Sequence, residues 1–274
     1  MPGRTIVITG ASDGIGRGAA RKLANRGEHV VLVGRSRAKT EALAAELGAP
    51  YELADFAVLD EVRGLADRLL ERFPVIDVLA NNAGGVAGSR IRTVDGHEWT
   101  FQVDHLSPFL LTHLLDPALV AGHASVIQTA SIANVLFSKL DLDDLDLRSG
   151  WTANRAYGNA KLANILFTRE LQARRGGDGL AAVAYHPGVL STNFAAEATG
   201  ILKLLYRTPL KHFFTQPAGV GVDRLVHLVE GRPGTDWQPG FYYDGTGPGR
   251  VSKSANDPAL ASGLWERSAA MLGL

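Results

Sequence analysis

Residues 5–16, TIVITGASDGIG, decide the fold. The first five residues, TIVIT, form a short run of β-branched, mostly apolar side chains, which is typical of a buried strand. A helical pattern begins at Ile15. Between them, Gly10 permits a tight turn, Gly14 lets the backbone approach a pyrophosphate, and Gly16 permits close helix–strand packing. Backbone N–H groups and the positive helix end would then bind the anion. The place of this turn after a first strand favours a dinucleotide site over a plain tight turn. The predicted cofactor-binding residues of this turn are Gly10, Ser12, Asp13, Gly14, Ile15 and Gly16.

The rest of the chain repeats this strand–helix unit. Apolar strand patterns occur at 29–33, 51–54, 76–80, 125–129, 181–185 and 240–243, and helical patterns at 37–47, 59–73, 96–119 and 156–175. Apolar strands that alternate with helices predict a parallel sheet covered on both faces. We therefore expect an α/β fold, a doubly wound (Rossmann) parallel sheet of about seven strands, formed as a single domain by residues 1–274.

Two stretches interrupt the alternation. Residues 132–154 are acidic in their middle, and residues 193–215 mix apolar with basic side chains. Both follow strands, and ligands of open α/β sheets bind beyond the carboxyl ends of the strands. We interpret 193–215 as a substrate lid whose apolar side chains favour a lipophilic substrate. A membrane-surface helix at 200–215 is the less favoured interpretation. The apolar side chains are Leu202, Leu205, Tyr206, Phe213 and Phe214.

Composition excludes several classes of protein. Among 274 residues, 46% are hydrophobic and 20% charged, which is enough apolar material for a core. The formal net charge of zero provides no basic field for nucleic acid. The absence of cysteine excludes disulfides and thiolate metal sites, and no H-E-x-x-H spacing is present, so we expect no metal. Neither a secretory signal nor a membrane span is visible, and a cytoplasmic location is expected.

The end of the second strand distinguishes NADP(H) from NAD(H). An NAD site usually has a carboxylate there for the ribose 2′-hydroxyl, whereas this chain has Gly34, Arg35 and Ser36. Arg35 could bind a 2′-phosphate through charge-assisted hydrogen bonds, and Ser36 could add a hydroxyl donor. The pattern therefore favours NADP(H). Asp55 could accept a hydrogen bond from the adenine amino group or could equally cap a helix.

A second group of polar residues suits proton transfer. Tyr157 and Lys161 are four residues apart in a strongly helical segment, so their side chains lie on one face. A nearby ammonium lowers the pKa of a phenol, which would let Tyr157 exchange a proton with an alcohol or a carbonyl oxygen. Ser131 ends the fifth strand, where its hydroxyl could hold the substrate oxygen or serve only in a turn. The turn at Asn82, Ala83 and Gly84 could form a floor under an adenosine, or be an ordinary Asn/Gly turn.

Taken together, these motifs resemble the short-chain dehydrogenase/reductase family, most closely its retinol-dehydrogenase-like branch. The matching pieces are TGASDGIG, NNAG, TASIAN, YGNAKLANILFTREL, HPGVLSTNF and DPALASGLWERSAAMLGL, in the family's order and over nearly the whole chain. The resemblance implies hydride transfer with NADP(H), and a homodimer or homotetramer. It implies Tyr157 as proton donor or acceptor, Lys161 as its pKa partner and Ser131 as holder of the substrate oxygen. It further implies that Pro187, Gly188 and Thr192 line the nicotinamide.

One position departs from the family's pattern. Where the family usually has Asn, in the helix that precedes its serine, this chain has Asp104. The family's Asn helps to hold a water in the proton relay from the lysine, and Asp104 keeps the backbone carbonyl but has no amide to donate. An ionised carboxylate there would raise the pKa of Lys161; alternatively, Asp104 only caps or bends its helix. The enzyme is the favoured interpretation, and an NADP(H)-binding sensor with little turnover is the alternative.

Overall fold

The computed structural model describes residues 3–188 and 218–274, and it contains the predicted doubly wound sheet. Seven parallel strands occur in the order β3-β2-β1-β4-β5-β6-β7, and a two-residue eighth strand pairs antiparallel with β7. The strands are β1 Thr5–Thr9, β2 His29–Gly34, β3 Tyr51–Leu53, β4 Val78–Asn81, β5 Ser125–Thr129, β6 Ala181–His186, β7 Tyr242–Asp244 and β8 Gly247–Pro248. The order reverses between β1 and β4, which is where ligands bind in such sheets.

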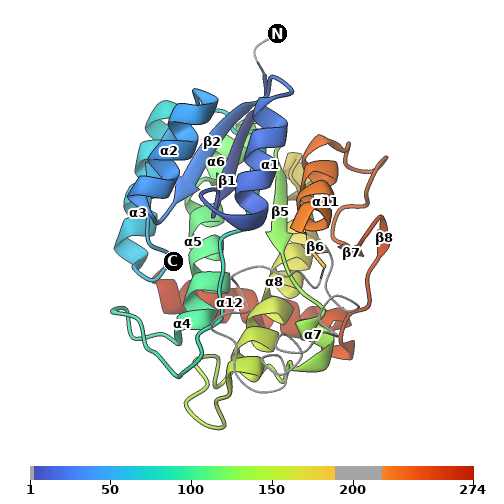
Figure 1. Cartoon of the computed structure of the whole chain (residues 1–274). Coiled ribbons are helices and arrows are strands. Elements are labelled where there is room, and N and C mark those ends of the chain that lie inside the picture. The colour runs from blue at the N-terminus through green and yellow to red at the C-terminus, as the bar shows by residue number, and fades with distance from the viewer. Residues whose placement is uncertain (1–2, 189–217) are drawn as a thin grey trace, which may run out of the picture.

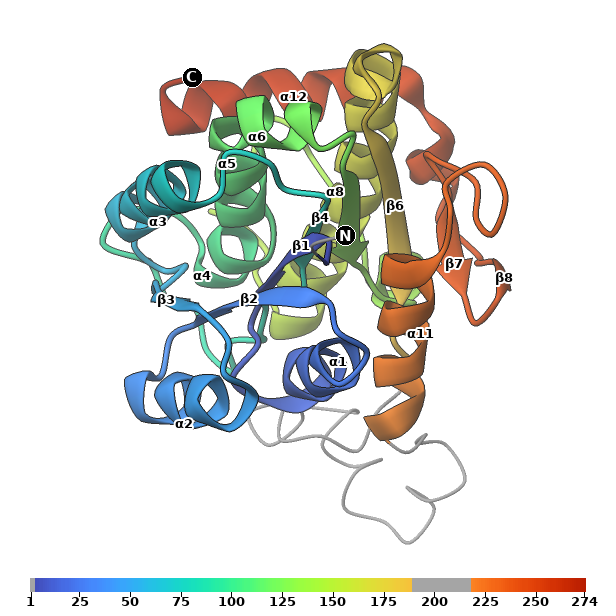
Figure 2. The same cartoon turned by 90° about the horizontal axis from the view of Figure 1, so that it is seen from above.

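Helices cover both faces of the sheet (Figure 2). Side chains alternate across a strand, so Ile6 and Ile8 pack with one helix layer and Val7 with the other. The first layer is α1 Gly14–Ala24, α2 Arg37–Leu47 and α11 Ala218–Glu230. The second layer is α3 Leu59–Arg72, α5 Ser107–Leu114, α6 Asp116–Ala121 and α8 Ala153–Arg175. The expectation of an α/β fold with helices on both faces is confirmed.

The C-terminal helix α12, Pro258–Leu272, lies across α8 and α5 rather than on the sheet (Figure 1). Trp265 anchors it, with its ring centroid 4.9 Å from that of Phe109 and 5.7 Å from that of Phe167. Asp257 caps its N-terminus by accepting hydrogen bonds from the backbone N–H groups of Ala259 and Leu260. The remaining short elements are α7 Ala133–Leu136, η2 Gly176–Asp178 and η4 Lys253–Asn256.

The predicted helix at 96–119 is several elements. It begins with α4, Trp99–Phe101, continues as a π-helical turn, η1, over Gln102–Leu106, and becomes α5 and then α6. Pro108 has no N–H to donate to the carbonyl of Asp104, four residues earlier, so regular α-helical bonding cannot continue there. Pro117 likewise coincides with the break between α5 and α6. The prediction of one continuous helix was therefore wrong, and Asp104 lies in the π-helical turn.

The predicted lid at 193–215 and the nicotinamide residue Thr192 lie outside the described residues. Within residues 3–188 and 218–274, no helix combines the length and apolar character needed to cross a membrane.

Candidate active site

The glycine turn is closely packed on one side and open on the other. Gly10 has a φ of 64°, and a Cβ on it would lie 2.9 Å from the Cα of Ala83. A Cβ on Gly16 would collide with the carbonyl oxygen of Gly10 and lie 2.7 Å from Nδ2 of Asn82. Gly14 has a φ of 52°, and a Cβ there would meet no atom of the described residues within 4 Å. The side of the turn at the N-terminus of α1 therefore leaves room for a bound group, as a pyrophosphate site requires.

Asp13 occupies the cap position of α1. Its Oδ1 accepts a hydrogen bond from the backbone N–H of Gly14 at 2.8 Å, and Lys39 Nζ lies 2.6 Å from its Oδ2. These two contacts lower the pKa of the Asp13 carboxyl. Asp13 thus holds the end of α1 and links it to α2, while Ile15 lies in the first turn of the helix.

The turn after β4 braces the glycine turn. Asn82 Nδ2 donates to the carbonyl oxygen of Thr9 at 2.9 Å, and the backbone N–H groups of Asn82 and Ala83 both donate to Thr9 Oγ1 at 3.0 Å. Thr9 was not predicted as a site residue, because its burial and its role as the acceptor for this turn appear only in the structure. The side chain of Asn82 and its backbone therefore position one loop of the site against another.

At the end of β2, the charges are exposed and loosely paired. The side chain of Arg35 is 68% exposed, and its Nη1 lies 4.0 Å from Oδ2 of Asp55. A Cβ on Gly34 would lie 3.1 Å from the Cβ of Ser12, so the glycine turn closely approaches this strand end. Ser36 is the cap residue of α2 and makes no side-chain capping bond, which leaves its hydroxyl available for a ligand.

Asp55 does not cap the following helix. Its Oδ1 accepts from the backbone N–H of Ala57 at 2.9 Å, which closes a local turn, and α3 begins only at Leu59. The N–H of Leu59 donates instead to Asp95 at 3.0 Å. Of the two hypotheses for Asp55, the helix cap is wrong, and contact with the nucleotide stays a prediction.

The centre of the candidate site is a buried ion pair. Lys161 Nζ lies 2.9 Å from Oδ2 of Asp104, with side chains that are 4% and 0% exposed. Oδ1 of Asp104 accepts from the backbone N–H of Gly85 at 2.7 Å, and Lys161 also donates to the carbonyl oxygen of Thr129 at 3.2 Å. A Cβ on Gly84 would lie 3.0 Å from Asp104 Oδ1, so the loop after β4 closes directly over the pair.

The ion pair determines the charge of Lys161. Burial alone would lower the pKa of this ammonium, but the Asp104 carboxylate, together with Tyr157, outweighs burial and raises it. Burial raises the pKa of the Asp104 carboxyl, opposed by Lys161 and by the N–H of Gly85. The short contact and the extra donors favour the charged forms of both groups at neutral pH. The hypothesis that Asp104 acts only on its own helix is thus wrong, because it faces Lys161 directly.

Tyr157 and Lys161 lie together as their spacing predicts. Lys161 Nζ is 5.3 Å from the centroid of the Tyr157 ring, within the range of a cation–π contact. Ser131 follows β5 two residues beyond Thr129, the residue whose carbonyl accepts from Lys161. It is buried, and its Oγ accepts from the backbone N–H of Ala133 at 3.2 Å. Helix α8 thus passes the carboxyl end of β5, the strand end that Ser131 follows.

Pro187 and Gly188 follow the end of β6, and both are partly exposed. Gly188 has a φ of 100°, a conformation that favours glycine. The described part of the chain ends here on this side of the site. A role for these two residues toward a nicotinamide stays a prediction.

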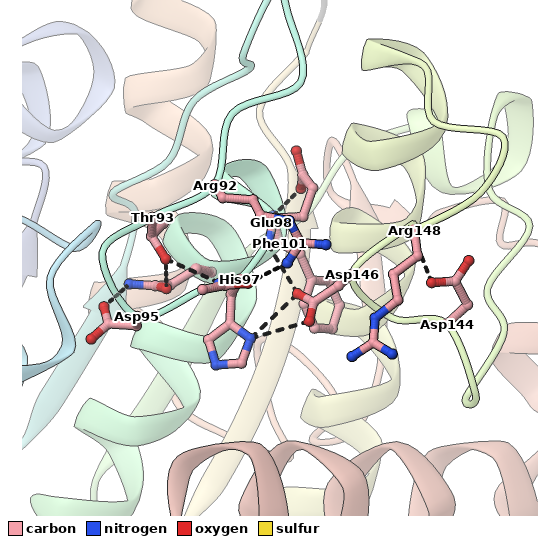
Figure 3. Close-up of polar contacts among 11 residues, drawn as sticks. Arg92, Thr93, Asp95, His97, Glu98, Phe101, Asp144, Asp146 and Arg148 are labelled. Carbon is pink, nitrogen blue, oxygen red and sulfur yellow. Dashed lines mark hydrogen bonds and ion pairs between the residues drawn. The ribbon is translucent and has the colours of Figure 1, made fainter.

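A polar cluster ties the loop before α4 to the loop before α8 (Figure 3). Asp146 accepts from the backbone N–H of Glu98 at 2.9 Å and lies 3.3 Å from Nδ1 of His97. Glu98 accepts from the N–H of Phe101 at 2.7 Å, which caps α4, and from the indole N–H of Trp151 at 3.2 Å. Burial raises the pKa of Glu98. The cluster fixes the start of the helical run that carries Asp104 relative to the start of α8.

Known proteins share these features. Residues 4–200 match the family described as short chain dehydrogenase. A protein of Streptomyces sp. (strain C5), named as a daunorubicin C-13 ketoreductase, is 42% identical over 280 residues, which cover 100% of this chain and 94% of that protein. Retinol dehydrogenase 12 of Mus musculus is 35% identical over 284 residues, with coverages of 100% and 88%.

The fold has a close counterpart among solved structures. The crystal structure of an uncharacterized protein from Mycobacterium Paratuberculosis superimposes with a TM-score of 0.78 at 32% identity, covering 98% of this chain and 93% of that one. The family match spans more than half of the chain, and the relatives align over all of it. The chain therefore belongs to the short-chain dehydrogenases, oxidoreductases of the Rossmann fold, and within them it is retinol-dehydrogenase-like.

Proposed function

We propose that this protein is an NADP(H)-dependent oxidoreductase that transfers a hydride between the nicotinamide and a lipophilic alcohol or carbonyl substrate. One observation carries the proposal: the buried ammonium of Lys161 lies under the Tyr157 ring at the carboxyl end of β5, and the open side of the glycine turn lies at the carboxyl end of β1, which only β4 separates from β5 in the sheet. A proton-transfer group and a dinucleotide-binding turn at one sheet edge are what such a reaction needs.

Each residue of the central group has a distinct part in the proposed reaction. In the direction of reduction, Tyr157 donates its phenolic proton to the carbonyl oxygen of the substrate, which the hydroxyl of Ser131 holds. The ammonium of Lys161 stabilises the phenolate that forms. The carboxylate of Asp104 keeps Lys161 protonated, and it is itself held by the hydrogen bond that it accepts from the N–H of Gly85. In oxidation, the phenolate takes the proton from the alcohol.

The glycine turn and the strand ends around it suit a dinucleotide. The nicotinamide, when bound, supplies or accepts the hydride. We propose that Gly10, Gly14 and Gly16 bind the pyrophosphate of the dinucleotide and that Asn82 and Ala83 lie under its adenosine. We further propose that Pro187 and Gly188 contact its nicotinamide. This assignment is supported by the open space over Gly14 and by the close packing beneath Gly10 and Gly16.

The preference for NADP(H) rests on Arg35. Its guanidinium is largely in water, and its carboxylate partner within residues 3–188 and 218–274 is distant, so it can bind a 2′-phosphate without first breaking a strong ion pair there. Among the residues at the end of β2, none is a carboxylate that would bind a ribose 2′-hydroxyl and repel a phosphate. Ser36, with its side chain unused in capping, is the second proposed donor.

A lipophilic substrate is supported by two observations. Leu136, five residues after Ser131 at the end of α7, is an apolar side chain that is 62% exposed. The relatives carry names that refer to retinol and to the C-13 ketone of daunorubicin, each a bulky molecule with an oxidisable or reducible oxygen. We therefore propose a substrate of that type, a bulky apolar alcohol, aldehyde or ketone.

A screen of turnover tests the function. The full chain is mixed with NADPH or NADH and with a panel of aldehydes and ketones that includes retinal, a polycyclic aromatic ketone and acetone, and the nicotinamide absorbance is followed. We expect turnover with NADPH, in preference to NADH, on the bulky apolar members. Tight NADPH binding without turnover of any member would instead identify an NADP(H) sensor. Equal rates with both cofactors would contradict the role of Arg35.

A further inference from the structure

One arginine ties helix α11 to the carboxyl end of the sheet. The helix packs against β6 and β7 through buried apolar side chains (Figure 2). From the same helix, Nη1 of Arg224 donates a hydrogen bond to the carbonyl oxygen of His186 and another to Oδ1 of Asp244, each at 2.8 Å. His186 and Asp244 are the last residues of β6 and β7, and they are partners in the sheet register. Arg224 therefore joins three elements where the proposed nicotinamide turn begins.

The peptide bond that Arg224 contacts joins His186 to Pro187. Proline has no N–H, so a hydrogen bond can fix the orientation of this peptide only through its carbonyl oxygen. That orientation determines where the proline ring and the following Gly188 lie, because proline also fixes its own φ. The chain turns at once, since Gly188 has a φ of 100°. The hydrogen bond from Arg224 thus acts on the first residues of the proposed nicotinamide turn.

Charge and burial make this contact a strong one. A hydrogen bond from a guanidinium is stronger than one between neutral groups. The Arg224 side chain is only 16% exposed, and the Asp244 carboxylate shares the same Nη1, so the guanidinium is held beside the carbonyl oxygen. Burial lowers the pKa of the His186 imidazole to about 4, so this ring is neutral at physiological pH. It therefore does not compete with Arg224 as a cationic partner of the carboxylate.

We infer that Arg224 is a positioning residue for the nicotinamide, and that it acts through the His186 carbonyl on the place of Pro187 and Gly188. The inference rests on the proposed function, because it takes a dinucleotide to bind with its nicotinamide at this turn. Arg224 acts on the cofactor only through the turn. Its loss should therefore affect ligands that carry a nicotinamide and spare those that lack one.

The opposite end of the same helix offers a matched control. Nη1 of Arg4 donates to the carbonyl oxygen of Val229 on α11 at 2.9 Å, and Nη2 of Arg4 lies 2.6 Å from Oε1 of Glu28. Like Arg224, Arg4 bonds one backbone carbonyl and one carboxylate. It directly precedes β1, so it lies at the amino ends of the parallel strands, away from the site. Loss of either arginine should loosen α11, whereas only loss of Arg224 should affect the nicotinamide.

The test compares Arg224→Met and Arg224→Lys with the control Arg4→Met in the full chain. Calorimetry measures the binding of NADPH and of 2′,5′-ADP, which has the adenosine and the 2′-phosphate but no nicotinamide. Arg224→Met should weaken NADPH binding by about two- to ten-fold, the contribution of one hydrogen bond, and leave 2′,5′-ADP binding unchanged. Its kcat should fall by about ten- to a hundred-fold, because a misplaced nicotinamide is poorly aligned for hydride transfer. Arg224→Lys keeps a charged donor and should recover part of both losses.

The remaining variants separate positioning from stability. Arg4→Met should lower the Tm and leave the binding of both ligands unchanged. Asp244→Asn removes only the charge of the carboxylate, so it should weaken NADPH binding less, and it replaces Arg224→Met if that variant does not fold.

Unchanged NADPH binding in the folded variant at either position, 224 or 244, would overturn the inference. An equal loss of 2′,5′-ADP binding, or the same loss of NADPH binding in Arg4→Met, would also overturn it. The binding comparison needs no turnover, so it tests the positioning role even if the parent chain binds NADPH only as a sensor. A parent chain that did not bind NADPH would refute the proposed cofactor itself, and the inference with it.

Discussion

The two ends of the candidate site contain the same kind of ion pair in opposite surroundings. At the end with Tyr157, which we call the chemical end, Asp104 and Lys161 are 2.9 Å apart and removed from water. At the nucleotide end, Arg35 and Asp55 are 4.0 Å apart, and their side chains are 68% and 34% exposed. A buried pair is held by the fold and cannot lose one partner without leaving an uncompensated charge. An exposed pair contributes little and exchanges its partners readily. The chemical end is thus organised in advance, and the nucleotide end keeps its charge available for a ligand.

Removing the phenol at the chemical end should have the largest effect. Tyr157→Phe keeps the ring over Lys161 but has no titrating oxygen. Turnover with NADPH should fall by the ~10²–10⁴-fold typical of a positioned acid or base, with NADPH binding nearly intact. Steady-state rates and a fluorescence titration of NADPH measure the two quantities. Normal turnover in this variant would remove Tyr157 from the mechanism.

The next effect concerns stability. Asp104→Ala leaves the buried Lys161 ammonium without its carboxylate and should lower the free energy of unfolding by about 3–5 kcal/mol. Asp55→Ala, the matched change at the nucleotide end, should stay within about 1 kcal/mol. Urea unfolding followed by circular dichroism compares both with the parent chain. If both variants lost the same free energy of unfolding, burial would not make the Asp104–Lys161 pair more important for stability than the Arg35–Asp55 pair.

At the nucleotide end, the expected effect is on affinity. A charge-assisted hydrogen bond contributes ~1.5–3 kcal/mol, so Arg35→Ala should weaken NADPH binding by roughly ten- to a hundred-fold and leave NADH binding almost unchanged. Arg37→Ala is the control, because Arg37 is equally exposed but pairs with Glu41 at 2.9 Å. Calorimetric titration of both cofactors measures the change. If Arg37→Ala weakens NADPH binding as much as Arg35→Ala does, general positive charge rather than a 2′-phosphate contact is responsible.

The smallest expected effect is a shift in pH dependence. Asp104 raises the pKa of Lys161, so Asp104→Asn should lower that pKa and move the basic limb of the oxidation profile to lower pH. The loss of a negative charge near Tyr157 should also make its phenolate easier to form, so activity should be kept or increased. The position of the basic limb is measured from rates of alcohol oxidation at intervals of about one pH unit between roughly pH 6 and pH 11. A profile that superimposes on the parent's would contradict the electrostatic link, and a collapse of activity would mean that the carboxylate itself takes part in the chemistry.

Elements whose signal is local were predicted well from the sequence. The helix Arg37–Leu47 and the strand Ser125–Thr129 have the predicted bounds, because each is set by its own periodicity and flanking residues. The π-helical turn was not predicted, since a proline four residues after an acceptor can be accommodated in more than one way. The two-residue strand β8 has too few residues for any pattern.

The candidate site was predictable where spacing along one helix suffices. Tyr157 and Lys161 lie on one face as a four-residue spacing requires. The pairing of Asp104 with Lys161 joins residues far apart in the chain, and only the resemblance to a family drew attention to Asp104. Thr9 gave no such signal, because a buried threonine in an apolar segment looks like ordinary core. Its partners, the backbone N–H groups of Asn82 and Ala83, become visible only when the sheet is assembled.

Gly158, which follows Tyr157 in α8, determines how closely this helix approaches the loop after Ser131. A Cβ on Gly158 would lie 2.7 Å from the backbone carbon of Phe137 and 2.7 Å from the backbone nitrogen of Ser138. Helix α8 therefore rests on the main chain that leads away from Ser131, and no side chain acts as a spacer between them. The distance between Tyr157 and Ser131 is therefore set by a contact between two stretches of main chain, and repacking of side chains cannot change it. Descendants of this chain could change substrate by altering the loops around this contact while the distance between proton donor and substrate oxygen stayed the same.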